Sequence, residues 1–366
     1  MEMCYHTERK RSQDIMKTVR VNASKPYDVI IGHGLLRNAG EYISKVTKAK
    51  RFAVICDDNI APLYLDTVKA SLENEGYAWE EFVFPHGESS KSTDTLVRIY
   101  SFLASAHFTR TDAVIALGGG VTGDMAGYAA ATYLRGMDLI QIPTSLLAQV
   151  DSSVGGKTAI DIPEGKNLVG AFKQPDLVLI DTDTIATLPR YYLIDGMGEV
   201  VKYGMIRSAS LFEKLCGCDI DHIGGILDDI IYECVSIKRD VVEADEFDRG
   251  ERALLNFGHT LGHSIEQYYH YTGISHGRAV AKGMQLVTAI AEEHGLCGEG
   301  LGKRLEECLA KYELVIEVEP TLPQLGTAVL NDKKRDGDSI GIVVCDKVGH
   351  SSVVKMTVDT FLSYLG

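Results

Sequence analysis

Residues 112–134 read DAVIALGGGVTGDMAGYAAATYL, which is an apolar run, a glycine-rich turn and a helical pattern in succession. The run at 112–117 is typical of a buried strand, and the turn Gly118–Asp124 contains the spacing G-x-G-x-x-G. Such glycines let the backbone approach a pyrophosphate, and the amides of the helix N-terminus favour an anion. A tight turn whose glycines serve packing would look the same, so dinucleotide binding stays open here. Asp57 and Asn59, at the end of an earlier predicted strand, are candidates for a ribose contact.

Apolar runs and helical patterns alternate on both sides of this unit. Strand-like runs lie at 27–32, 51–57, 80–85, 112–117, 138–143 and 176–181, separated by helical stretches such as 63–75 and 93–106. This alternation predicts βαβ units and a parallel sheet. Beyond residue 188 the patterns are long and helical, at 192–206, 225–242, 252–269, 276–295 and 299–312, before a β-like run at 339–345. We therefore expect a disordered extension at 1–15, an α/β Rossmann-like domain at 16–188 and a mainly α-helical domain at 189–366.

Composition limits the function classes. The 366 residues are 45% hydrophobic and 24% charged, as in globular proteins, and the length suits two domains. The net charge of −14 argues against nucleic-acid and membrane-surface partners, because these partners require a basic face. The sequence has no apolar run near the roughly 20 residues of a membrane span, no signal peptide and no C-x-x-C pair among its eight cysteines. These features favour a cytoplasmic protein with reduced thiols that acts on small molecules.

The segment 252–269 has a polar face if it forms one helix. At about 100° per residue, five hydrogen-bonding side chains share one arc. A solvated surface is the ordinary explanation of such an arc. Here histidine and asparagine stand where a solvated face favours lysine and glutamate, and two glycines accompany the histidines, so we predict a functional face. Its members are Arg252, Asn256, His259, His263 and Glu266.

The histidines of this segment also suggest a metal. His259 and His263 have the i, i+4 spacing of H-E-x-x-H, but Thr260 replaces the glutamate, which argues against a metalloprotease. His276 opens the next predicted helix, and Glu199 lies in an earlier one. A single histidine or glutamate is most often structural. Two imidazoles and one carboxylate with an open position, however, are typical of a catalytic zinc site.

Seven motifs occur in one order along the chain: GGGVTGD (118–124), RG (135–136), IPTSLLAQVDSSVGGKTAID (142–161), GKNLVGAF (165–172), LPRYYLIDGMGEVVKYG (188–204), LNFGHTLGHSIE (255–266) and SHGRAVAKGM (275–284). Over these motifs the chain resembles the 3-dehydroquinate synthase family of sugar phosphate cyclases, from about residue 19 to the C-terminus. The resemblance implies an NAD-binding domain followed by a helical domain that binds metal and substrate.

The resemblance also implies roles for individual residues. A divalent metal, Zn²⁺ or Co²⁺, would be held by Glu199, His259 and His276. NAD⁺ would be contacted by Asp57, Asn59, Glu88, Ser89, Ser90, Lys91, Gly120, Val121, Thr122, Gly123, Asp124, Thr144, Ser145, Lys157, Lys166, Thr184, Ile185, Ala186 and Thr187. The phosphorylated substrate would be contacted by Asp151, Asn167, Lys202, Lys238, Arg252, Asn256, His263, a buried Lys157 and either Lys333 or Lys334. Arg135 would reach the site of a neighbouring subunit, which implies a homodimer.

The reaction implied by this resemblance converts 3-deoxy-D-arabino-heptulosonate 7-phosphate to 3-dehydroquinate and phosphate, in the shikimate pathway. Oxidation by NAD⁺ precedes β-elimination of phosphate, reduction, ring opening and aldol closure, and His263 and Lys202 are candidates for proton transfer and oxyanion stabilisation. Alternatives are a related cyclase that makes 2-deoxy-scyllo-inosose or 2-epi-5-epi-valiolone, a metal-dependent polyol dehydrogenase, and a non-catalytic relative. Three residues depart from the common family pattern near the metal motifs: Gly198, Arg278 and Lys282.

Overall fold

The computed structural model describes residues 16–330 and 339–366. The expected extension at 1–15 and the candidates Lys333 and Lys334 lie outside the described residues. The chain divides into two compact units. The first holds the described residues up to Leu188 together with Lys238–Phe247, and the second holds Pro189–Ile237 and Asp248–Gly366. Residues 238–247, which the sequence patterns place in the second domain, thus group with the first unit.

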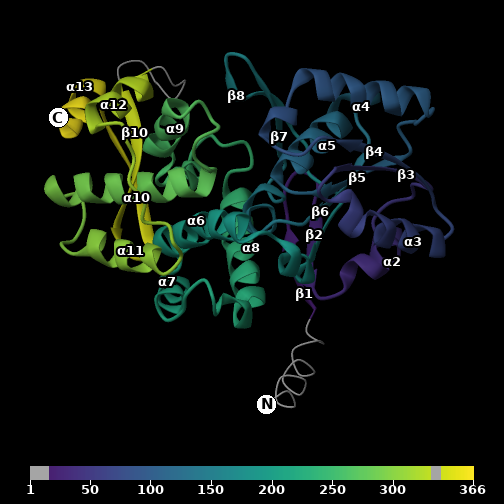
Figure 1. Ribbon diagram of the computed structural model, residues 1–366, viewed down its shortest axis with the longest axis horizontal. Coiled ribbons are helices and arrows are strands. Elements are labelled where there is room, and N and C mark those ends of the chain that lie inside the picture. The colour runs from purple at the N-terminus through teal and green to yellow at the C-terminus, as the bar shows by residue number, and fades with distance from the viewer. Residues whose placement is uncertain (1–15, 331–338) are drawn as a thin grey trace, which may run out of the picture. The chain divides into compact units, whose positions relative to one another are not determined.

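A seven-stranded sheet forms the centre of the first unit (Figure 1). Its order is β1 (Lys17–Val21), β2 (Tyr27–Gly32), β9 (Leu177–Asp181), β6 (Asp138–Pro143), β5 (Ala113–Gly118), β3 (Arg51–Asp57) and β4 (Ala78–Phe84). The β1–β2 pair is antiparallel and the other neighbours are parallel. The predicted strands and parallel pairing are confirmed, with ends shifted by one or two residues at β4, β5 and β9.

Alternate residues of the central strands enter two different cores. Val54 of β3 and Ile115 of β5 lie in the core that includes α2 (Ala39–Ser44) and α3 (Asp66–Asn74). Their neighbours Ile55 and Ala116 lie in the core that includes α4 (Thr93–Ser105) and α5 (Gly120–Thr132). Because helices cover both faces of the sheet, the strands are continuous apolar runs without polar alternation.

Three strands of the first unit were not predicted. They are β1 and the separate antiparallel hairpin of β7 (Lys157–Ile162) and β8 (Gly165–Phe172). No residue of β8 is buried, and the strand begins with the polar or glycine residues GKN, so its sequence is not a continuous apolar run like those of the buried strands.

The second unit is mainly helical. Its elements are α6 (Arg190–Arg207), α7 (Ala209–Cys216), the first part of α8 (Leu227–Ala244), α9 (His259–Tyr268), α10 (His276–Glu293), α11 (Leu301–Ala310), α12 (Leu322–Leu330), the hairpin β10 (Ser339–Lys347) and β11 (His350–Thr357), and α13 (Val358–Leu365). Helix α10 packs against α6, α9 and α11 (Figure 1). Among residues 16–330 and 339–366, no helix has the length and hydropathy to cross a membrane.

The predicted single helix at 252–269 was wrong. The structure has a short 3-10 helix, η8 (Glu251–Asn256), and then α9, which begins at His259. Between them Gly258 adopts a left-handed conformation with φ of 78°. A Cβ at this position would lie 2.5 Å from Met284 Cγ and 2.6 Å from the Val280 carbonyl oxygen, so only glycine fits. The arc that linked Arg252 and Asn256 to the histidines by helical periodicity therefore does not exist.

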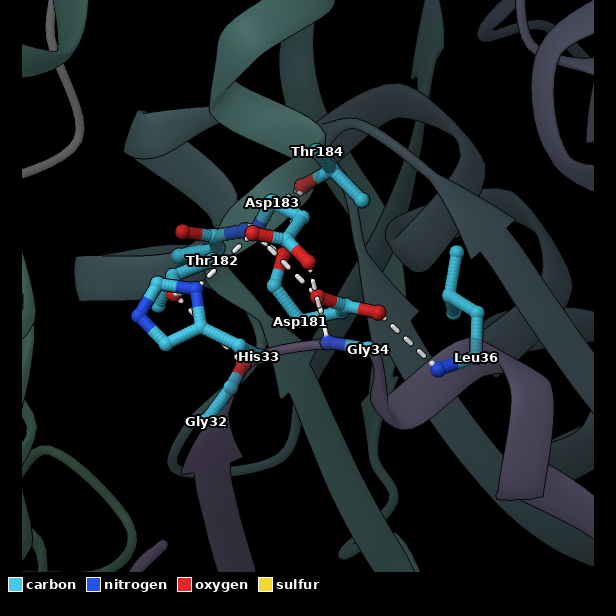
Figure 2. A network of polar contacts seen from close by, with 9 residues as sticks. Gly32, His33, Gly34, Leu36, Asp181, Thr182, Asp183 and Thr184 are labelled. Carbon is cyan, nitrogen blue, oxygen red and sulfur yellow. Dashed lines mark hydrogen bonds and ion pairs between the residues drawn. The ribbon is translucent and has the colours of Figure 1, made fainter. Parts of the chain in front are cut away.

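A buried carboxylate connects the ends of β2 and β9 (Figure 2). Asp181 accepts hydrogen bonds from the backbone N–H groups of Gly34 (3.0 Å), Leu36 (3.0 Å) and Asp183 (3.1 Å). Burial raises the pKa of Asp181, although these N–H groups favour its charged form. The network holds the start of the 3-10 helix η6 (Thr182–Thr187), which contains four of the NAD candidates, beside the loop that follows β2.

Candidate active site

Three side chains from three helices of the second unit lie together. Glu199 is in the middle of α6, and His259 and His276 are the first residues of α9 and α10. Glu199 Oε1 is 3.6 Å from His259 Nε2 and 3.6 Å from His276 Nε2. Potential ligand atoms of the three residues lie within 4.8 Å of one another. The structure therefore brings together the three residues that the sequence selected as metal ligands.

The two histidines present the same ring nitrogen, Nε2, to Glu199. His259 Nδ1 lies 3.2 Å from the carbonyl oxygen of Phe257, and His276 Nδ1 lies 3.4 Å from Glu266 Oε2. In each ring Nε2 faces Glu199. Burial lowers the pKa of His276, but the Glu199 and Glu266 carboxylates outweigh this effect and raise the pKa well above the ordinary imidazole value. The two carboxylates consequently favour a positive charge at the position of His276.

A close crossing of two helices places Glu199 beside His276. A Cβ on Gly198 of α6 would lie 2.4 Å from the carbonyl oxygen of Gly277, and a Cβ on Gly277 would lie 1.8 Å from that of Asp195. Asp195 Oδ1 also accepts a 2.6 Å hydrogen bond from the Gly277 N–H and so caps α10. The approach of α6 and α10 explains Gly198 in this chain, since any side chain there would separate the helices.

Gly277→Ala is expected to weaken both the fold and the metal cluster. The new methyl group meets backbone atoms, which cannot rotate away, so we expect a loss of about 3 kcal/mol in the free energy of unfolding. Gly302→Ala in α11 is the control, because its Cβ would meet only the flexible Glu292 carboxylate at 3.0 Å. Urea unfolding of both variants, with zinc content measured alongside, tests this. Equal stability of the two variants would contradict the role of the crossing.

Lys202 and His263 lie beside the cluster of Glu199, His259 and His276. Lys202 is 1% exposed, and its ammonium donates to Glu199 Oε2. The ring centroid of His263 lies 5.4 Å from that of His259 and 6.1 Å from that of His276. His263, Glu266 and His276 form a second group whose ligand atoms lie within 4.8 Å of one another. The two potential donor sets therefore share His276.

Arg252 and Asn256 belong to η8, which packs against α6, β10 and β11 within the second unit. Arg252 is 2% exposed, so its guanidinium is held inside the protein. Asn256 is partly buried. Their position follows from tertiary packing and not from the helical spacing to His259 that the sequence suggested.

Two buried lysines anchor substrate and cofactor candidates in the first unit. Lys238 is 5% exposed and its Nζ donates to Asp151 Oδ1 at 2.9 Å. Lys91 is also 5% exposed and donates to Asp124 Oδ2 and Asn167 Oδ1, each at 2.5 Å. Burial lowers the pKa of Lys91, but the Asp124 charge and its neighbours outweigh this effect and raise it. Both ammonium groups are therefore fixed in place by carboxylates.

The candidates for the ribose contact lie next to the glycine-rich turn. Asp57 Oδ1 accepts from the backbone N–H of Asn59 at 3.0 Å, and Asp57 Oδ2 accepts from Thr122 Oγ1 at 3.3 Å. Burial raises the pKa of Asp57. Thr144, at the end of β6, is 2% exposed, and its Oγ1 has no hydrogen-bond partner among the residues that the structure describes. These polar groups gather at the carboxyl ends of β3, β5 and β6, where doubly wound sheets bind ligands.

The glycines of the turn have separable roles. A Cβ on Gly118 would lie 2.5 Å from Thr122 Oγ1, and one on Gly127 would lie 2.5 Å from Thr158 Cγ2. Cβ atoms on Gly119 and Gly120 would meet only the Ser145 and Ser152 hydroxyls, at 3.4 and 3.2 Å. Close packing therefore accounts for Gly118 and Gly127, whereas Gly119 and Gly120 face side-chain hydroxyl groups at the N-terminus of α5.

The remaining candidates are more dispersed. Lys157 begins β7 and is exposed, so the expectation of a buried ammonium was wrong; the residue lies on the outward hairpin and not on the apolar sheet. Lys166 pairs with Glu88 at 3.5 Å. Arg135 has a left-handed φ of 67°. The other candidates lie in short segments of the first unit: Ser89 and Ser90 in the 3-10 helix η3 (Glu88–Ser90), Val121 and Gly123 in α5, Ser145 after β6, and Thr184, Ile185, Ala186 and Thr187 in η6.

The structure also shows site neighbours that were not selected from the sequence. Glu266 was noted on the polar arc but not chosen, because its contact with His276 forms only when α9 packs on α10. Asp195 was missed because its contact with Gly277 forms only when α6 packs on α10. Arg278 and Lys282 depart from the common family pattern. The guanidinium carbon of Arg278 lies 4.7 Å from the centre of the Tyr191 ring, and Lys282 Nζ lies 3.9 Å from Glu317 Oε2.

Solved structures share this fold over nearly the whole chain. A 2-deoxy-scyllo-inosose synthase complexed with carbaglucose-6-phosphate, NAD⁺ and Co²⁺ has a TM-score of 0.85 and 25% identity, covering 95% of this chain and 99% of that chain. The 2-epi-5-epi-valiolone synthase of Streptomyces hygroscopicus subsp. jinggangensis 5008, with NAD⁺ and Zn²⁺ bound, has a TM-score of 0.82 and 25% identity, covering 93% and 95%. Fold and site thus define a protein of the sugar phosphate cyclase class.

Sequence comparison narrows this class. The family model of the 3-dehydroquinate synthase N-terminal region matches residues 81–195, and that of the C-terminal region matches residues 196–335. A 3-dehydroquinate synthase of Clostridium perfringens (strain 13 / Type A) is 49% identical over 349 residues, which span 94% of this chain and 100% of that relative. The chain belongs to the 3-dehydroquinate synthase family.

Proposed function

We propose that this chain converts 3-deoxy-D-arabino-heptulosonate 7-phosphate to 3-dehydroquinate and phosphate, with NAD⁺ and one divalent metal as cofactors. The observation that carries the proposal is the cluster of Glu199, His259 and His276 in a chain 49% identical to a 3-dehydroquinate synthase. The reaction is a carbon–oxygen lyase reaction that eliminates phosphate. It is redox-neutral overall, so the nicotinamide is used and regenerated in every turnover.

The cluster fits a metal by its donor chemistry and its spacing. In a tetrahedral site with bonds of about 2.0–2.2 Å, ligand atoms lie about 3.3–3.6 Å apart. The 3.6 Å separations of Glu199 Oε1 from the two Nε2 atoms agree with this spacing. When bound, Zn²⁺ or Co²⁺ supplies a Lewis acid for the hydroxyl and carbonyl oxygens of the substrate. With three protein ligands, the donor set leaves room for the substrate.

The end of the sheet fits a dinucleotide. Asp57 and Asn59 offer polar groups for a ribose, and the N-terminus of α5 offers backbone amides at Gly119 and Gly120, beside the Ser145 and Ser152 hydroxyls. The buried Thr144 hydroxyl, which has no hydrogen-bond partner among the described residues, lies at the same end of the sheet. When bound, NAD⁺ accepts a hydride from the substrate and returns it later in the same reaction.

The chain's own residues bind the anionic ends of the substrate and move its protons. Lys238 of the first unit, fixed by Asp151, and the buried Arg252 of the second unit would supply cations for an anionic substrate in a protein whose net charge is −14. Lys202, held by Glu199, would stabilise negative charge that develops on a substrate oxygen. His263 lies beside the cluster and would accept and donate a proton.

Two rival activities differ in what they release. A metal-dependent polyol dehydrogenase would release NADH and requires no phosphate-binding cations, whereas this chain holds Lys238 and Arg252 buried at 5% and 2% exposure. A related cyclase would accept another phosphorylated sugar, and the family match favours the heptulosonate substrate. We also propose a cytoplasmic homodimer in which Arg135 contributes to the partner's site.

The proposal is tested by direct assay. The purified chain, given the heptulosonate phosphate, NAD⁺ and Zn²⁺ or Co²⁺, is expected to produce 3-dehydroquinate, identified by mass spectrometry. Glucose 6-phosphate and sedoheptulose 7-phosphate serve as control substrates for the related cyclases. Turnover of either control sugar without turnover of the heptulosonate would contradict the proposal.

A further inference from the structure

We infer that Glu266 is a positioning residue for the metal site. Its carboxylate holds His276 through Nδ1 and thereby presents His276 Nε2 to a metal shared with Glu199 and His259. The inference rests on the proposed function, because it assumes that the cluster binds a metal. It assigns a role to a residue outside the three ligands.

The first observation is the position of the Glu266 carboxylate. Glu266 lies in the last turn of α9 and is 3% exposed. An ionised carboxylate removed from water requires a charged or hydrogen-bonding partner. Glu266 Oε2 lies 3.4 Å from His276 Nδ1, which gives the carboxylate such a partner.

The second observation is that the same arrangement occurs twice. His259 is held at Nδ1 by the carbonyl oxygen of Phe257, at 3.2 Å, and His276 is held at Nδ1 by Glu266. Both Nε2 atoms then lie 3.6 Å from the same oxygen of Glu199. A metal-ligating histidine commonly donates its other N–H to a carbonyl or carboxylate, which fixes its tautomer and ring orientation. The two histidines of this cluster show both forms of that support.

The same geometry argues against Glu266 as a ligand. A metal held by His263, Glu266 and His276 would use the edge of the His276 ring that faces Glu266, and that edge is Nδ1. The Nε2 atom would then face the fully buried Glu199 with no metal between them. In the group with Glu199, His276 would bind the metal through Nε2 and donate a hydrogen bond to Glu266 through Nδ1.

Glu266→Gln and Glu266→Ala test the inference with Zn²⁺ alone. The purified apoproteins are titrated with Zn²⁺ in competition with a chromophoric chelator, and Co²⁺ spectra report the coordination number. We expect the dissociation constant for Zn²⁺ to rise about 10- to 100-fold in both variants. Gln267→Ala, an exposed neighbour on α9, is the matched control and is expected to bind Zn²⁺ normally. Because Gln has the shape of Glu, thermal unfolding of the Gln variant should stay close to that of the parent.

Glu199→Gln separates the possible failures. Lost Zn²⁺ binding in Glu199→Gln together with normal binding in both Glu266 variants would overturn the inference and leave the proposed function intact. Loss in Glu266→Ala as complete as in Glu199→Gln would make Glu266 a ligand and would also overturn it. Normal Zn²⁺ binding by Glu199→Gln would instead overturn the metal site on which the proposed function depends.

Discussion

His259→Ala is expected to lose bound metal and nearly all activity. His259 offers one of three potential ligand atoms that lie within 4.8 Å of one another, and a three-ligand catalytic site would have no spare ligand. We expect zinc content close to zero after purification and a fall in kcat of at least about 1,000-fold. Metal analysis and steady-state kinetics of the same preparation measure both effects.

His263→Ala is the internal control for this prediction. The His263 ring lies only 5.4 Å from that of His259, so substitution at either position disturbs the same region. We assign His263 to proton transfer, which typically contributes about 100- to 10,000-fold to a rate. The His263→Ala variant should therefore retain zinc and lose turnover. Equal loss of zinc in both variants would contradict the separate role of His263, and loss of zinc in His263→Ala alone would place the metal in the group of His263, Glu266 and His276 instead.

Lys157→Ala is expected to lower kcat/KM by about 100-fold without destabilising the protein. A hydrogen bond to a charged group contributes about 1.5–3 kcal/mol, and a phosphate provides such a group. Because Lys157 is exposed at the start of β7, we expect its removal to create no cavity in the core. Steady-state kinetics and thermal unfolding of the variant measure the two effects separately.

Lys45→Ala is the matched control for Lys157. Lys45 is also an exposed lysine of the first unit, and its ammonium forms an ion pair with Glu41 at 2.8 Å and lies 5.1 Å from the centre of the Tyr42 ring. Its removal should leave kcat/KM unchanged. Near-normal kcat/KM in Lys157→Ala would remove Lys157 from the substrate site.

The sequence was sufficient for the elements whose pattern arises from burial. The strands β2, β3, β5, β6 and β9 are apolar because both faces of the sheet are covered, and that pattern is visible without a structure. The hairpin β7–β8 was not predicted because its strands are not buried on both faces and therefore lack a continuous apolar pattern. The break at Gly258 was not predicted because a glycine inside a helical pattern is equally typical of a packing residue. Its φ of 78° and its close approach to Val280 and Met284 of α10 appear only in the structure.

The residues of the candidate site likewise divide into those that the sequence could identify and those that it could not. Glu199, His259 and His276 could be selected from residue type and family motifs, and the structure brings them together. Glu266 and Asp195 could not be selected, because their roles depend on where α9 and α6 meet α10. Arg252 and Asn256 were selected both by the family motifs and by helical periodicity, and the structure contradicts only the argument from periodicity. Periodicity shows which faces are buried, whereas contacts between helices decide which side chains meet.

The central claim is that this chain uses NAD⁺ as a recycled catalyst in a phosphate-eliminating cyclisation. The most direct measurement is the number of phosphate ions released per NAD⁺ supplied, with NADH absorbance recorded in the same cuvette. With the heptulosonate phosphate in excess and the metal bound, we predict many phosphate ions per NAD⁺ and no lasting NADH signal. Accumulation of one NADH for each substrate consumed, without release of phosphate, would contradict the claim and identify a dehydrogenase.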